Sequence, residues 1–120
     1  MNNKKFWIII AAISGFSAVA IGAFGAHGLK EKLTTEMLDV YKTGVLYHLV
    51  HTVVLLTLAL SEKVKSNLAS IFFLTGIILF SFSLYIYSTS GIKFFAMITP
   101  FGGVSFLIGW IMIIVSLRRG

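Results

Sequence analysis

The residues of this chain with the greatest chemical potential are three histidines and the tyrosines near them. His48 and His51 are three positions apart, so on a helix of ~3.6 residues per turn both face within roughly 60° of one direction. Imidazoles can ligate zinc or copper, bind a haem iron or hydrogen-bond to a quinone carbonyl. We expect polar side chains to form one candidate cluster, whose members are His27, Tyr47, His48, His51, Tyr85, Thr99 and Pro100.

Each of these ligand chemistries lacks a component that its usual sites contain. The chain has no cysteine, and its long apolar stretches contain neither aspartate nor glutamate. A metal could therefore use only His27, His48 and His51, and no haem attachment motif accompanies them. We expect no cofactor, with His48 and His51 neutral and hydrogen-bonded to neighbouring helices, and we keep a metal, haem or quinone site as the alternative.

Catalytic machinery of the familiar kinds is missing from the sequence. It contains no phosphate loop, no nucleophile elbow and no paired carboxylates. We therefore predict no catalytic residue, and the sequence favours a protein that is not an enzyme.

Four apolar stretches must position the polar residues, since 58% of the chain is hydrophobic and its mean hydropathy is +0.96. Each has about 20 residues, enough at ~1.5 Å per residue to cross a hydrocarbon core of ~30 Å. Backbone groups cannot stay unpaired in lipid, so each stretch must be helical. We expect an all-α integral membrane protein with four transmembrane helices in an up-down-up-down antiparallel bundle. This single transmembrane domain covers 1–120, with helices at about 6–26, 36–60, 68–89 and 94–117.

The charged residues predict the orientation of these helices. Basic residues gather at the ends of apolar stretches, which is typical of membrane helices and not of a nucleic-acid-binding surface. With both termini in the cytoplasm, that side holds six of the ten basic residues: Lys4, Lys5, Lys63, Lys65, Arg118 and Arg119. We expect this topology, in which the polar cluster lies in the outer half of the membrane, and we expect Thr35 to cap the second helix.

Small residues predict where the helices approach one another, because helices in lipid associate through close contact. The expected packing positions are Ser14, Ala18, Gly22 and Ala26 on the first helix and Gly102, Gly103 and Gly109 on the fourth. Pro100 is expected to kink the fourth helix. The alternative is an unwound segment whose backbone binds a ligand, as in some transporters.

Several motifs resemble a family of small bacterial membrane proteins known as domain of unknown function 423. They are the runs 22–30 (GAFGAHGLK), 43–51 (TGVLYHLVH), 80–85 (FSFSLY) and 98–103 (ITPFGG), together with Gly109 and Trp110. Residues that match the family pattern are His27, Tyr47, His51, Ser81, Ser83, Tyr85, Thr99, Pro100, Gly102, Gly103 and Trp110. His48 stands where glutamine is usual and Phe82 where glycine is usual, which weakens any mechanism that needs two histidines on the second helix.

The resemblance also extends to a small eukaryotic four-span family. It implies a four-helix multi-pass protein of the bacterial inner membrane with no established activity. We expect a structural, assembly or partner-binding protein in contact with the lipid bilayer, as a homo-oligomer or with another membrane protein. The alternatives are a small-ligand module centred on His27, Tyr47 and His51, and a small dimeric transporter. Transporters of that kind rely on a glutamate in the first helix, which this chain lacks.

Overall fold

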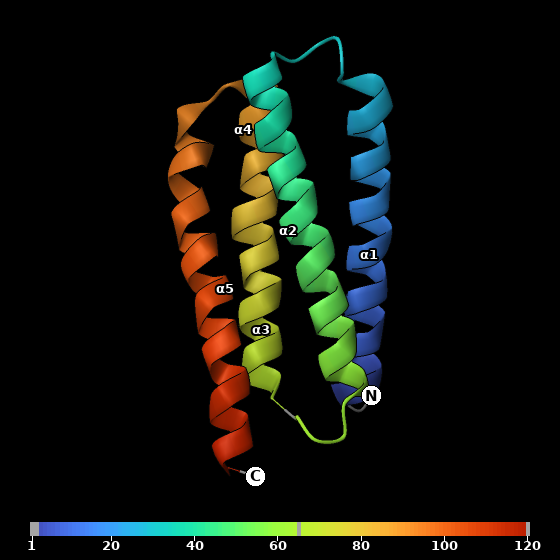
Figure 1. Cartoon of the computed structure of the whole chain (residues 1–120), viewed down its shortest axis with the longest axis vertical. Helices are drawn as coiled ribbons and strands as arrows, with labels where there is room; N and C mark the ends of the chain where they lie inside the picture. The colour runs from blue at the N-terminus through green and yellow to red at the C-terminus, as the bar shows by residue number, and fades with distance from the viewer. Residues whose placement is uncertain (1–2, 65, 120) are drawn as a thin grey trace.

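Four long apolar rods packed antiparallel make up the structure, a computed structural model that describes residues 3–64 and 66–119 (Figure 1). Each rod is long and apolar enough to cross a membrane. The all-helical antiparallel architecture expected from the sequence is thereby confirmed. The third rod is divided into three consecutive segments. The elements are α1 (Asn3–Gly28), α2 (Thr35–Leu60), α3 (Asn67–Gly76), the π-helix η1 (Ile77–Phe82), α4 (Ser83–Ser90) and α5 (Lys93–Arg119).

The third rod is the central one. In its most apolar window 44% of the residues are buried, against 22% in α1 and in α5. The helix α1 packs chiefly along α2, whereas α5 packs along the whole third rod (Figure 1). Side chains of α2 can therefore meet α1 on one side and the third rod and α5 on the other.

Hydroxyl side chains cap two of the helices. Thr34 caps α2, because its hydroxyl oxygen accepts from the backbone N–H of Met37 at 3.1 Å. The predicted cap at Thr35 was wrong by one residue, because the helix already begins at Thr35 and Thr34 has the extended backbone that a capping residue needs. Ser66 caps α3 in the same way, accepting from Ala69 at 3.1 Å.

The π-helix in the third rod was not predicted, because one wider turn barely changes an apolar pattern. It widens the turn where α5 approaches most closely. A Cβ on Gly102 would lie 2.2 Å from the backbone nitrogen of Phe80. Beyond η1 the hydroxyl of Ser83 lies 2.6 Å from that of Thr99, which joins the third rod to α5.

The small residues of α1 pack along a line that differs from the predicted one. Ser14 and Ala18 are buried, but Gly22 is only half-buried and Ala26 is exposed, whereas Gly25 is buried against the ring of Tyr41. On a helix of ~100° per residue, each residue in a series spaced by four is rotated by ~40° from the one before. The fourth residue of this series, Ala26, therefore no longer lies on the contact face. The spacing from Ala18 to Gly25 is seven residues, which drifts far less.

In α5 two of the three predicted glycines make the close contacts. Gly102 touches the η1 backbone, and a Cβ on Gly109 would lie 2.8 Å from the ring of Phe73. The nearest atom to a Cβ on Gly103 is 3.9 Å away, an ordinary contact. Pro100 is exposed and α5 is continuous through it, so the unwound segment considered above does not form.

Replacing Gly102 with alanine is expected to destabilise the fold by about 1–3 kcal/mol, since its methyl group would collide with backbone that cannot rotate away. The matched control is Gly103→Ala, which should be neutral or stabilising by up to ~1 kcal/mol through helix propensity. Reversible unfolding in mixed micelles measures both. Equal stability of the two variants would contradict this description of the α5 contact.

Candidate functional site

His48 lies at the centre of the bundle and is fully buried. Its Nδ1 is 2.8 Å from the hydroxyl of Tyr85 on α4, and its Nε2 is 3.3 Å from the hydroxyl of Ser17 on α1. The single proton of the Ser17 hydroxyl is donated to the carbonyl of Ser14 at 2.8 Å. Ser17 must therefore accept from His48, so the imidazole carries its proton on Nε2, and Nδ1 accepts from Tyr85. One directed chain of hydrogen bonds thus runs from α4 through α2 to α1.

His51 is also buried, one turn further along α2. Its Nδ1 lies 2.8 Å from the carbonyl oxygen of Tyr47, which can only accept, so Nδ1 carries the proton. The indole N–H of Trp110 on α5 can only donate, and it lies 3.2 Å from Nε2. His51 is therefore neutral, with the opposite tautomer to His48. Its ring also stacks on that of Phe106, with centroids 3.7 Å apart and planes 11° apart.

The two histidines share the inner side of α2 but serve different neighbours. His48 connects α2 to α1 and α4, whereas His51 connects α2 to α5. Ser14 and Thr52 add a bond between their hydroxyl oxygens, 2.6 Å apart, beside this pair. These side chains lie around the midpoints of α1 and α2, so the cluster is not confined to the outer half where the sequence placed it.

The side chains of four other predicted members take no part in the hydrogen bonds of this network. His27 is exposed at the end of α1, and Pro100 is exposed on α5. Thr99 contacts Ser83 instead of a histidine. Tyr47 contributes its backbone carbonyl to His51, while its side chain is 40% exposed and packs its ring against Phe80 and His51, with centroids 4.6 Å and 5.9 Å apart. Tyr85 is the predicted member whose side chain hydrogen-bonds to a histidine, at 2.8 Å from Nδ1 of His48.

A metal site made of His27, His48 and His51 is not assembled. In the described part of the chain, no three histidine, cysteine, aspartate or glutamate side chains gather closely enough to hold an ion. Both nitrogens of His48 and of His51 are already engaged in hydrogen bonds. A ligand could reach His51 Nε2 only by displacing the Trp110 indole. The arrangement is suited to holding helices in register.

Sequence reasoning missed several partners of the histidines. Ser17 and Thr52 were overlooked, Ser14 was expected only in helix packing, and Trp110 was noted only through the family resemblance. Their signal was present: Ser14 and Ser17 lie on one face of α1 at the depth of His48. In lipid, hydroxyl groups at one depth on neighbouring helices are natural partners.

The family model described as "Protein of unknown function (DUF423)" matches residues 21–103. The chain belongs to this family. It is 44% identical over 117 residues to the UPF0382 membrane protein YwdK of Bacillus subtilis, covering 93% of this chain and 95% of that protein. It is 40% identical over 121 residues to the UPF0382 inner membrane protein YgdD of Escherichia coli K12, covering 98% and 92%. No solved structure matches it.

These comparisons confirm the predicted family and, together with the four apolar rods, the membrane location. The chain is a multi-pass membrane protein of the DUF423/UPF0382 family, embedded in the inner or cell membrane. The family description specifies no activity.

Proposed function

We propose that this protein is a non-catalytic membrane component that binds a transmembrane helix of a partner along the face formed by α2 and α5. The proposal rests on which polar side chains of the bundle have hydrogen-bond partners within it. Both interior histidines have such partners, whereas the hydroxyl of Tyr47, on the lipid-facing surface, has none among the described residues.

The internal histidines support a structural role over chemistry. Haem iron, a metal ion or a quinone at His51 would have to replace a hydrogen bond to Trp110 or to the Tyr47 carbonyl. At His48 it would have to replace Tyr85 or Ser17. Side-chain hydrogen bonds between membrane helices average about 0.6 kcal/mol each, so several together set the register without making the bundle rigid.

The observation that carries the proposal is the environment of Tyr47. This side chain lies near the middle of α2 and is 40% exposed on the lipid-facing surface. Its ring rests on Phe80 and Phe106, and within residues 3–64 and 66–119 its hydroxyl takes part in no hydrogen bond. A hydroxyl facing hydrocarbon without a partner is unfavourable by roughly 1–3 kcal/mol.

A partner helix can satisfy this hydroxyl with a backbone carbonyl or a Ser or Thr oxygen. Trp110, 43% exposed on α5, borders the same face and adds aromatic contact area. Tyrosine and tryptophan are the residues that contribute most at protein interfaces. The partner is thus a transmembrane helix with an accessible acceptor, from a second copy or from another protein.

Photo-crosslinking in living cells tests this proposal. A photoreactive residue in place of Val50, 45% exposed and one turn from Tyr47, is expected to link to a protein. The matched control at Phe16, 79% exposed on α1, should link only to lipid. Tyr47→Phe should weaken the Val50 link severalfold. The proposal fails if Val50 and Phe16 give the same products; the mass of the product distinguishes a second copy from another protein.

We also propose that both termini lie in the cytoplasm. The support is the charge distribution, since six of the ten basic residues then lie on the cytoplasmic side. The chain has no cysteine, so single cysteines can be introduced without background. A membrane-impermeant thiol reagent added to intact spheroplasts should label Ser90→Cys and spare Ser61→Cys. The reverse pattern would overturn this orientation.

A further inference from the structure

A cavity of about 310 Å³ lies at the end of the bundle that holds the amino-terminal end of α1, far from the histidines. It is bounded by the first turns of α1, the last turn of α2 and the first turns of α3. This volume is at the lower end of the range for small-molecule sites, about 300–1,000 Å³. The space can therefore hold a group about the size of a lipid headgroup.

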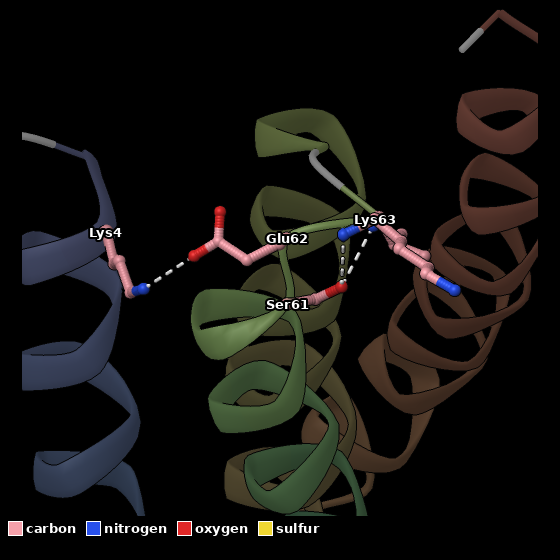
Figure 2. Close-up of polar contacts among 5 residues, drawn as sticks. Lys4, Ser61, Glu62 and Lys63 are labelled. Carbon is pink, nitrogen blue, oxygen red and sulfur yellow. Dashed lines mark hydrogen bonds and ion pairs between the residues drawn. The ribbon is translucent and has the colours of Figure 1, made fainter.

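Among the described residues that line the cavity, Lys4 carries a positive charge and Glu62 a negative one. Lys4 of α1 reaches across to Glu62 in the connection between α2 and α3, with Nζ and Oε1 3.1 Å apart (Figure 2). The two side chains are 50% and 74% exposed, so water and ions screen their attraction strongly. An incoming group with both charges can exchange for this pair without leaving either side chain unpaired.

Inside the cavity the polar groups include one with no internal partner. Ser70 is only 3% exposed and lines the cavity, yet in the part of the chain that the structure describes its hydroxyl makes no hydrogen bond. Beside it, the indole N–H of Trp7 donates to Oδ1 of Asn67 at 3.2 Å, which fixes the amide so that its NH₂ group remains a donor. Because Ser70 lines the cavity, its hydroxyl is available to a ligand that enters it.

The position of the cavity along the bundle identifies the kind of molecule. Lys4 and Glu62 belong at the headgroup layer of a membrane, while the wall formed by Leu58 and Ala59 is apolar and part of the span. A ligand here meets charge at one end and hydrocarbon at the other. Phospholipids have this character, and a soluble metabolite does not.

We propose that this cavity binds the headgroup of a phospholipid that carries a phosphate and a primary ammonium, the phosphatidylethanolamine class. The phosphate accepts from Lys4, from the Asn67 amide and from the Ser70 hydroxyl, while the ammonium donates to the Glu62 carboxylate. A trimethylammonium headgroup has no N–H to donate, and a glycerol headgroup has no cation. Phosphatidylcholine and phosphatidylglycerol should therefore bind less well. This inference does not depend on the proposed partner.

Native mass spectrometry of the full chain in detergent tests this assignment with three lipids of equal chain length. Phosphatidylethanolamine is expected to bind about fivefold more tightly than phosphatidylcholine or phosphatidylglycerol, the effect of one partly exposed charged contact. Glu62→Gln should abolish the preference, and Glu36→Gln, an exposed acid on α2 at the other end of the bundle, should retain it. Lys4→Gln should lower the affinity for all three lipids alike.

Equal binding of the three lipids by the wild-type chain would overturn the assignment, and so would a preference that survives Glu62→Gln. Soluble phosphoethanolamine separates the two possible sources of the headgroup. Weak binding of this probe is expected, because it lacks the chains that lie along Leu58 and Ala59. Binding as tight as that of the lipid would contradict a membrane ligand.

Discussion

Hydrocarbon offers no hydrogen bonds, and this constraint explains the interior of the bundle. Every polar group that a helix carries into the membrane must find its partner within the protein or remain unsatisfied. The directed chain from Tyr85 through His48 to Ser17 and Ser14 meets this requirement, and so does the pairing of His51 with Trp110. Histidine is suited to the task because its neutral ring offers one donor and one acceptor to two different helices.

Ser81 and Tyr47 both carry a hydroxyl without a hydrogen-bond partner in the described segments, and their surroundings differ. Ser81, in the π-helix, is fully buried and its oxygen has no partner. We attribute this to the widened turn, which alters the carbonyls within reach of a side chain. Tyr47 is different, since its hydroxyl lies on the lipid-facing surface where another molecule can reach it. That accessibility makes Tyr47, and not Ser81, the basis for a proposed partner.

Hydropathy was sufficient to predict the architecture, whereas the contacts inside it were beyond the sequence. Long apolar runs must become helices in lipid, and short connections make neighbours antiparallel. The spacing of His48 and His51 predicted that both rings lie on one side of α2, but it did not predict which helix each ring meets. The partners of each ring depend on η1, whose wider turn is not visible in the apolar pattern. They also depend on how α1 packs, where a seven-residue spacing buries Gly25 in place of Ala26. His27 shows the same limit. Its residue type suggested that it binds a ligand, but its position at the end of α1 leaves the side chain exposed.

Both interior histidines are neutral and hydrogen-bonded at both ring nitrogens, with opposite tautomers. Solid-state NMR of ¹⁵N-histidine-labelled protein in lipid bilayers at neutral pH tests this directly, with His48→Gln to assign the signals. We predict a proton on Nε2 of His48 and on Nδ1 of His51, with shifts that do not change when a chelator is added. Imidazolium shifts, a shared tautomer or a metal-bound nitrogen would contradict the account.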